Sequence, residues 1–245
     1  MRFLIIVLSL LSEKYITHEF QRLRQTVLEN YLSLLKRLLP ESVMTTHPLS
    51  PYGISLSILL VLAAALQWIG GQGIGSVLNF VFEFAIFYLC LGEHNLFYVN
   101  SNQTMILSSE EYIVAMNREV FAPILWFFIF GPMGAILYRV TDFFSKSAQN
   151  QHLLNLMQAL DWLPARVSSI LFLMVGQFQP GFSALLKQLT KSPESNETLL
   201  IDSAKHAINH HEKNELNFIQ LENLFIHSCI LLNFILAVYV IGKIL

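Results

Sequence analysis

Hydrophobic stretches alternate with polar stretches along most of the chain. Four of them, residues 52–69, 74–91, 120–138 and 224–241, approach the roughly 20 residues that an α-helix needs to cross a bilayer. A fifth stretch, residues 167–175, is shorter and could be re-entrant, interfacial or part of a tilted span. The pattern predicts an all-α fold, a polytopic membrane helix bundle with four to six hydrophobic segments.

The N-terminal region combines a short apolar run with an amphipathic segment. Residues 3–11 are apolar, and Glu13 and Lys14 follow without a small-residue cleavage site, so we expect an uncleaved anchor. Between residues 13 and 39 hydrophobic residues recur every three or four positions, which is typical of a helix with one apolar face. Four basic residues lie off this face: Arg22, Arg24, Lys36 and Arg37. Such a helix could lie on an anionic membrane surface or pack against other helices.

We expect one membrane domain over residues 1–245, with five successive regions. They are an N-terminal anchor with a basic amphipathic helix (1–51), a helical hairpin (52–91), a central region (92–178), a polar loop (179–223) and a C-terminal span (224–245). Within the hairpin, the sequence Gly70-Gly71-Gln72-Gly73 favours a tight turn, because glycine tolerates positive φ.

Composition supports lipid as the main surroundings of this chain. Hydrophobic residues make up 54% of it and charged residues only 13%, about half the charged fraction of an average soluble domain. The lipid bilayer is therefore the expected partner. A net charge of -2 offers no general basic face, so nucleic acid is not an expected partner. Five of the fifteen Lys and Arg residues lie between Lys14 and Arg37, which places residues 14–50 in the cytoplasm by the positive-inside rule.

No motif in the sequence indicates a catalytic, cofactor or metal site. The chain lacks a phosphate-binding loop, a G-x-S-x-G elbow and a C-x-x-C pair. His206 and His210 have the i, i+4 spacing of zinc ligands, but no H-E-x-x-H glutamate accompanies them, and a solvated helix face is the favoured interpretation. We therefore expect no catalytic residues, no metal and no cofactor.

Four charged residues are candidates for a functional face. Glu83 lies deep in an apolar stretch, where a carboxylate marks either a functional position or a helix-to-helix contact. Arg139 ends the third hydrophobic stretch. In the strip from Asp161 to Arg166, we expect Asp161 to be a helix N-cap and Pro164 to lie in the first turn. Arg166 would then sit at headgroup depth as a structural anchor, or bind an anion beside the helix N-terminus.

Three stretches around these residues resemble the AmpE family of bacterial inner-membrane proteins. They are Phe121-Ala122-Pro123-Ile124-Leu125-Trp126, Gly131-Pro132-Met133-Gly134-Ala135-Ile136-Leu137-Tyr138-Arg139, and Ala159-Leu160-Asp161-Trp162-Leu163-Pro164-Ala165-Arg166, with Gly176 and Phe178 beyond. The likeness covers most of the chain in layout and is specific from Asn117 to Phe178. It implies a multi-pass protein of the bacterial inner membrane with a role in β-lactamase regulation and sensing of cell-wall recycling, and a membrane or cell-wall-recycling partner protein.

AmpE proteins belong with the wider CobD/CbiB-like membrane family, which leaves two alternative functions open. The enzyme branch condenses an amino-alcohol with a cobyric-acid carboxylate in cobalamin synthesis and carries an Asn-Thr-Leu-Asp motif after the Tyr-Arg that matches Tyr138-Arg139. This chain has Asp142-Phe143-Phe144-Ser145 at that place, so we expect no synthase activity. The other alternative is a small transporter that uses Glu83 and the helix broken at Gly131-Pro132.

Overall fold

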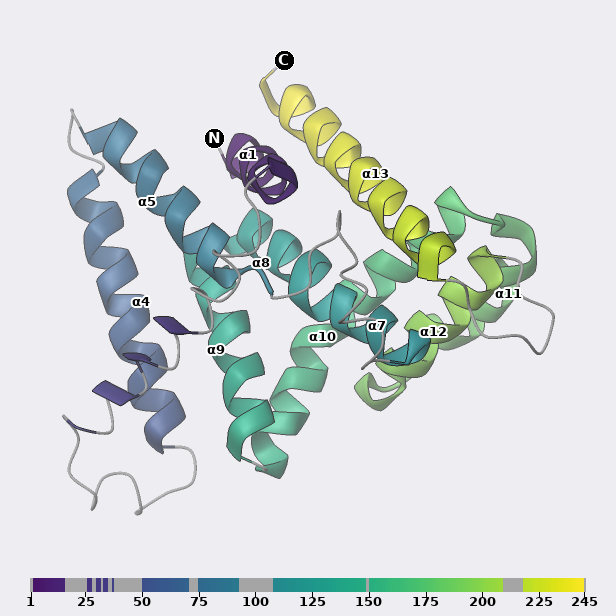
Figure 1. Ribbon diagram of the computed structural model, residues 1–245, viewed down its shortest axis with the longest axis horizontal. Helices are drawn as coiled ribbons and strands as arrows, with labels where there is room; N and C mark the ends of the chain where they lie inside the picture. Colours follow the sequence, from purple (N-terminus) through teal and green to yellow (C-terminus); the bar gives the residue numbers. More distant parts are fainter. Residues whose placement is uncertain are drawn as a thin grey trace. The chain divides into compact units, whose positions relative to one another are not determined.

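A computed structural model describes residues 2–15, 26–27, 30–31, 33–34, 37, 50–70, 75–92, 108–148, 150–208 and 218–244. Within these ranges all regular secondary structure is helical and no strand occurs, which confirms the predicted all-α class (Figure 1). Most of the predicted amphipathic segment 13–39, the glycine turn after Gly70 and the His210 position lie outside the described residues.

The chain folds into two compact units, which alternate along the sequence. Unit 1 comprises residues 1–93 and 123–157, and unit 2 comprises residues 94–122 and 158–245. The chain passes between the units inside two helices, α8 (Ala122–Phe130) and α10 (Gln151–Val175). The five regions predicted from the sequence follow one another along the chain, and they did not predict that the two units would alternate.

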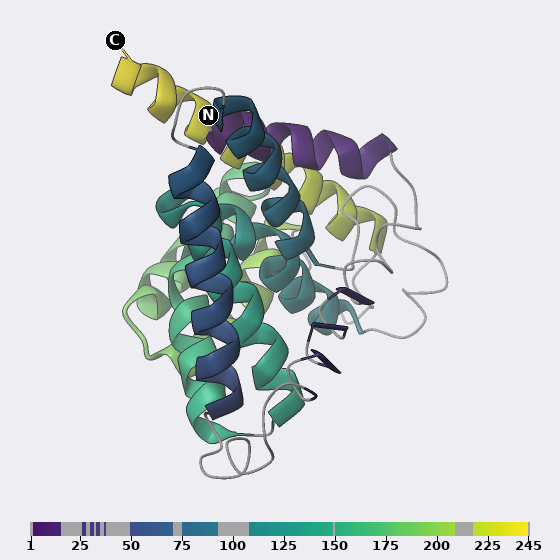
Figure 2. The ribbon, with the colours of Figure 1, turned by 90° about the vertical axis from the view of Figure 1, so that its left-hand side faces the viewer.

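Unit 1 is built around the two helices of the predicted hairpin, α4 (Ser50–Gly70) and α5 (Gly75–Cys90). They lie side by side in both ribbon views (Figures 1 and 2). Helix α9 (Pro132–Ala148) contacts both, and α1 (Arg2–Tyr15) contacts α5. The Tyr52 hydroxyl shares a 3.0 Å hydrogen bond with Thr141 of α9, and its ring meets Phe144 edge-on, which holds the first turn of α4 against α9.

Unit 2 packs its helices around a cluster of aromatic rings. Its elements are α7 (Ser109–Met116), the π-helical turn η1 (Asn117–Phe121), most of α10, α11 (Phe178–Leu189), the 3-10 turn η2 (Pro193–Ser195), α12 (Asn196–Ala207) and α13 (Phe218–Ile244). Phe172 of α10 lies between Phe121 and Phe225, with ring centroids 5.7 and 5.3 Å away, and Tyr112 meets Phe225 at 5.5 Å. Edge-to-face pairs at such distances join η1, α10 and α13 in one core.

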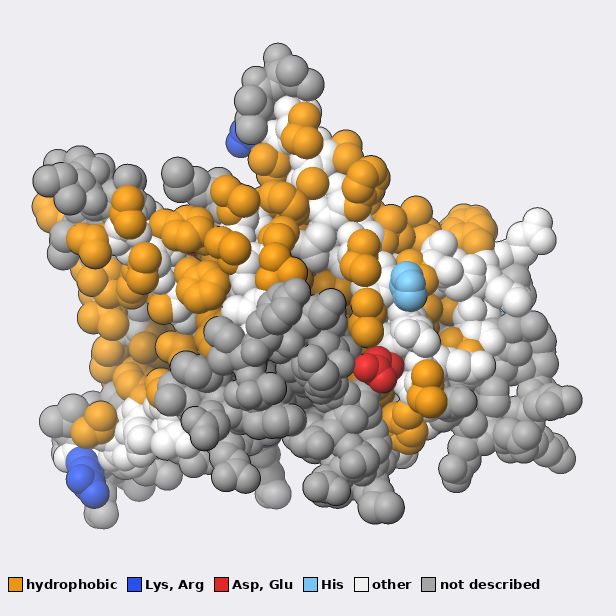
Figure 3. Space-filling view, turned by 45° about the horizontal axis from the view of Figure 1, so that its top comes forward, with side chains coloured by type: hydrophobic (Ala, Val, Ile, Leu, Met, Phe, Trp, Pro, Cys, Tyr) orange, Lys and Arg blue, Asp and Glu red, His pale blue; other side chains and the backbone are white. Residues whose placement is uncertain are grey.

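Three described helical stretches are long and apolar enough to cross a membrane: Pro51–Trp68, Ser109–Phe130 and Phe218–Lys243. Large hydrophobic side chains on the first and third are exposed, with Val61 at 68% and Ile230 at 61%. Exposed hydrophobic side chains also dominate the described surface in Figure 3, with few charged ones among them. Lipid is the solvent that favours such surfaces, and the chain is a membrane protein with transmembrane helices.

The third predicted membrane span lies too far toward the C-terminus. The predicted span 120–138 is not one helix, because Gly131 adopts φ of +72° and separates α8 from α9. The apolar helical stretch runs instead from Ser109 to Phe130. A left-handed glycine followed by proline stops one helix and starts the next, since only glycine adopts this conformation without strain and proline suits a first helical position.

Residues 92–119 and the predicted polar loop 179–223 both contain helices. In residues 92–119, α7 starts with a capping box, in which Ser108 and Glu111 each accept a hydrogen bond from the other's backbone N–H. The predicted polar loop 179–223 contains most of α11 and all of α12. The inward faces of these helices carry Leu185, Leu199 and Leu200, all buried. The polar residues that favoured a loop are those of the outward, solvent-facing sides of the same helices.

Candidate functional site

The helical stretch that begins at Ser109 in unit 2 changes from α-helical to π-helical winding at Asn117, where three polar residues interrupt its apolar sequence. Residues Asn117–Phe121 form a π-helical turn between α7 and α8. Asn117 and Glu119 of this turn are buried, at 1% and 5% exposure. Single π-helical turns inside α-helices occur often at functional positions, so the polar residues around this turn are the candidate site.

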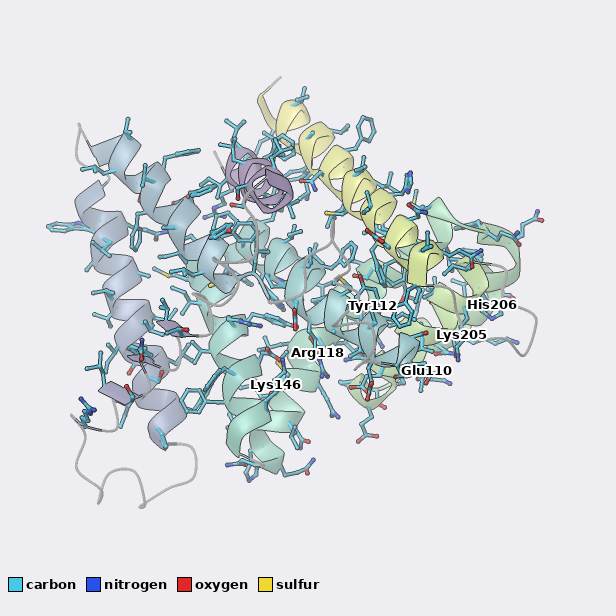
Figure 4. All side chains as sticks on the ribbon, in the orientation of Figure 1. Glu110, Tyr112, Arg118, Lys146, Lys205 and His206 are labelled. Atoms are coloured by element: carbon cyan, nitrogen blue, oxygen red, sulfur yellow. The ribbon has the colours of Figure 1, made fainter. Side chains whose placement is uncertain are left out.

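Arg118 of the π-helical turn bridges two other helices through carboxylates. Its Nε lies 2.8 Å from Oδ2 of Asp161 on α10, and its Nη2 lies 3.1 Å from Oε1 of Glu197 on α12 (Figure 4 labels Arg118). The Asp161 side chain is only 5% exposed, whereas the Glu197 side chain is 57% exposed. The guanidinium therefore pairs with one buried and one solvent-facing carboxylate, and it ties η1, α10 and α12 together.

A second polar contact links the π-helical turn to α10. The Ser168 hydroxyl donates a 2.8 Å hydrogen bond to Oδ1 of Asn117, and both side chains are buried. A buried polar group without a partner is costly, so this bond fixes the register of the turn against α10.

Arg166 donates hydrogen bonds to three neighbouring backbone carbonyls and to one side chain. It donates to the carbonyl oxygens of Leu189 at 2.7 Å, Lys191 at 2.9 Å and Trp162 at 2.9 Å, and to Oδ1 of Asn196 at 2.8 Å. Its guanidinium carbon lies 4.1 Å from the centroid of the Trp162 ring. Burial lowers the pKa of Arg166, yet arginine stays charged in proteins. Arg166 thus clamps the α11–α12 connection onto α10, a structural contact that the sequence did not predict.

The expected N-cap at Asp161 is wrong. Helix α10 begins at Gln151, ten residues earlier, and Asn150 caps it, with its Oδ1 accepting from the His152 N–H at 2.9 Å. Pro164 therefore lies inside the helix and not in its first turn. Asp161 faces Arg118 from the middle of α10, so its carboxylate serves an ion pair instead of a helix end.

The other two predicted site residues belong to unit 1. Glu83 of α5 accepts a 3.3 Å hydrogen bond from Nδ2 of Asn79, one turn away on the same helix. Arg139 of α9 forms a 3.1 Å ion pair with Asp142, which also binds Lys146 at 3.0 Å. The structure thus places Asp161 and Arg166 in one unit with Arg118, and places Glu83 and Arg139 in two separate polar contacts of the other.

The break between α8 and α9 is covered by the N-terminal helix. Arg2 of α1 donates to the carbonyl oxygens of Phe128 and Ile129, at 3.3 and 3.2 Å. Its guanidinium also lies 3.0 Å from the position that a side chain on Gly131 would take. Transporters use such exposed carbonyls to coordinate ions, whereas here a cation of the protein already binds two of them.

Comparison of the chain with models of known families, with curated proteins and with solved structures found no match. Any function assigned to the polar cluster in unit 2 therefore depends on the geometry of the cluster and on the resemblance of the surrounding sequence to the AmpE family.

Sequence reasoning missed several residues of this cluster, among them Arg118 and Asn196. A signal for Arg118 exists, because Asn117-Arg118-Glu119 is a run of three polar residues directly before a long apolar stretch. Asn196 stands in a polar segment and shows no such signal. Its Oδ1 accepts from Arg166 and its Nδ2 donates to the Gln158 carbonyl at 2.8 Å. Within the described ranges, no group of three His, Cys, Asp or Glu side chains could hold a metal ion.

Gly176 allows the close approach that positions α12 under α10, and we expect Gly176→Ala to destabilise the protein. A Cβ there would lie 2.3 Å from the backbone oxygen of Ala207, the atom that accepts from the Gln177 N–H at 3.0 Å. Overpacking of this kind costs about 1–3 kcal/mol. Thermal unfolding of the purified protein in detergent measures the loss. Gly242→Ala is the matched control, since its Cβ would meet nothing within 4 Å; equal melting of the two variants would contradict this expectation.

Proposed function

We propose that this chain is a multi-pass protein of a bacterial inner membrane that acts as a non-enzymatic component of β-lactamase regulation, as its resemblance to the AmpE family implies. One observation carries the proposal. The region where the resemblance is specific, Asn117 to Phe178, supplies both sides of the buried contacts in unit 2, namely Arg118 with Asp161 and Asn117 with Ser168. Asp161, which belongs to the resembling stretches, is thus held by a residue from the same region of the chain.

The solvent-facing end of this cluster is the part that a regulatory partner could contact. Glu197 is exposed and holds Arg118 from outside, while Asp161 holds it from within. A membrane or cell-wall-recycling protein that offered a cation to Glu197 would weaken its hold on Arg118 and act on the π-helical turn. Exposed ion pairs contribute about 1 kcal/mol or less, so such an exchange requires little energy.

The test combines gene deletion with one substitution. Deletion of the gene should change β-lactamase activity after exposure to an inducing β-lactam, measured by hydrolysis of a chromogenic cephalosporin. Complementation by the parent chain should restore the original response, and complementation by Glu197→Gln should not. Glu194→Gln is the matched control, because Glu194 is exposed in the preceding 3-10 turn and is close in sequence. An unchanged response after deletion would rule out the regulatory role.

Synthase activity of the cobalamin type is not part of the proposal. The residues in place of the enzyme motif serve contacts within unit 1: Asp142 binds Arg139 and Lys146, Ser145 donates to the Asp142 carbonyl at 2.8 Å, and Phe144 packs on Tyr52. We expect that this chain does not rescue a strain that lacks the cobalamin synthase. Growth of that strain on a cobalamin-dependent medium would overturn the expectation.

The proposed topology places residues 14–50 in the cytoplasm, and the connection between α4 and α5 on the other side. It rests on the basic residues between Lys14 and Arg37 and on the candidate span Pro51–Trp68. Alkaline phosphatase fused after Gln72 should be active, because that enzyme folds only outside the cytoplasm. The same reporter fused after Ser42 should be inactive, and the reverse result would refute the orientation.

A further inference from the structure

Unit 1 contains an apolar pocket between its membrane helices. Its volume is about 210 Å³, and α4, α5 and α9 supply most of its walls, among them Leu59, Ala63, Phe82, Ile86 and Ile136. Apolar cavities of about 150 Å³ remain dry and accept a molecule of the size of benzene. This pocket is therefore large enough for a segment of hydrocarbon chain.

The lining of the pocket includes two polar side chains. Arg139 lines it, and so does Tyr31, whose hydroxyl donates a 3.0 Å hydrogen bond to the Ser55 carbonyl. Arg139 shares Asp142 with Lys146, so these three groups carry a net charge of +1. Thr141, two residues beyond Arg139, bonds to Tyr52 at the start of α4, where a tyrosine suits the headgroup region of a bilayer.

The other walls of the pocket open to the surroundings of the protein. Leu62 of α4 also lines it and is 56% exposed, and Leu89 of α5 is 36% exposed. In a bilayer these side chains face lipid, so a hydrocarbon chain can enter sideways while its headgroup stays at the depth of Arg139. A cation that lines an apolar pocket, two residues from the Thr141 that bonds to the start of α4, matches an amphiphile with a negative head and a single inserted chain.

We propose that this pocket binds one hydrocarbon chain of a membrane phospholipid with an anionic headgroup, whose phosphate lies at Arg139. The site is separate from the polar cluster of unit 2 and does not depend on the regulatory role proposed above. It gives unit 1 a preference for anionic over zwitterionic lipid.

Cys90 provides the readout, because it lines the pocket and the chain has only one other cysteine, Cys229. In a Cys229→Ala protein purified in detergent, N-ethylmaleimide modifies Cys90 alone, and mass spectrometry follows the rate. Lysophosphatidylglycerol at about ten times its dissociation constant should slow this reaction by about tenfold, since about a tenth of the sites then stay empty. Lysophosphatidylcholine should have a smaller effect, and inorganic phosphate, which lacks a chain, should have none.

Three substitutions distinguish binding in the pocket from general effects of lipid on the protein. Ala63→Leu fills the pocket and should abolish protection by lysophosphatidylglycerol. Ala65→Leu adds the same side chain at an exposed position of the same helix and should preserve it. Arg139→Gln should reduce the protection to the level of lysophosphatidylcholine.

Each other outcome overturns the proposal. Protection that survives Ala63→Leu would place the lipid outside the pocket. Equal protection by the two lysolipids, or by phosphate, would remove the anionic lipid as the ligand, and so would no protection at all. If Ala63→Leu fails to fold, as judged by size-exclusion chromatography, the comparison of Arg139→Gln with the parent protein decides.

Discussion

Arg166→Ala should lower the stability of the protein by about 3 kcal/mol and reduce its level in the membrane. The arginine binds three backbone carbonyls and the Asn196 side chain, and hydrogen bonds from a charged donor contribute about 1.5–3 kcal/mol each. Alanine leaves these acceptors without their donor where α11 and α12 join α10. The melting temperature of the purified protein should fall by about 6–12 °C, given the usual dependence for a chain of this size.

Two further variants make this result specific to the clamp. Arg166→Lys retains the charge but cannot reproduce the planar fork of donors, so it should recover only part of the lost stability. Lys187→Ala removes an exposed cation from α11 and should change the melting temperature by little. A melting temperature of Arg166→Ala equal to that of the parent would show that the clamp does not stabilise the fold. In that case Arg166 would become a functional residue again, tested by β-lactamase induction.

Asp161→Asn should cost about 2 kcal/mol, through the buried arm of the Arg118 bridge. The Asp161 side chain is 5% exposed and the Arg118 side chain 26%. Loss of one partner of a fully buried pair costs about 3–5 kcal/mol, and the partial exposure of Arg118 and its second carboxylate, Glu197, reduce this figure. Thermal unfolding of Asp161→Asn, Arg118→Met and the double variant measures the coupling, which should be about 1–2 kcal/mol.

The ion pair between Lys205 and Glu110 is the matched control for this cycle. It also joins two helices of unit 2, α12 and α7, and both residues are labelled in Figure 4, but its side chains are 37% and 53% exposed. Solvent screens such a pair, so Lys205→Met with Glu110→Gln should show a coupling below about 1 kcal/mol. A coupling for Arg118 and Asp161 as small as this control would mean that burial adds nothing to the bridge.

Much of the fold follows from the sequence, because hydrophobic length and periodicity are local properties. The apolar run at residues 52–69 predicts the candidate span in α4 almost at its observed bounds, and the run at 224–241 lies within the longer candidate span Phe218–Lys243 of α13. The Gly131-Pro132 pair predicts an interruption, which the structure places between α8 and α9. The start of α7 also has a local signal, since Ser108 and Glu111 have the spacing of a capping box.

The candidate site could be predicted only in part. Asp161 and Arg166 stand out as charges beside apolar sequence, and both are buried. Their partners are distant in the chain: Arg118 is 43 residues from Asp161, and Asn196 is 30 residues from Arg166. No local pattern reports such a pairing, so an N-cap was the best local explanation for Asp161 although its partner is an arginine on another helix.

By itself, therefore, the sequence determined that this is a helical membrane protein and where its strongest apolar segments lie, because a bilayer selects helices by length and hydrophobicity. Tertiary structure alone decided which charges are neutralised and by which partners. A charged side chain buried among apolar helices is stable only when a neighbouring group pairs with it or forms hydrogen bonds to it. Helix packing brings Arg118 into an ion pair with Asp161 and brings backbone carbonyls within hydrogen-bond distance of Arg166. It also forms the pocket that Arg139 lines.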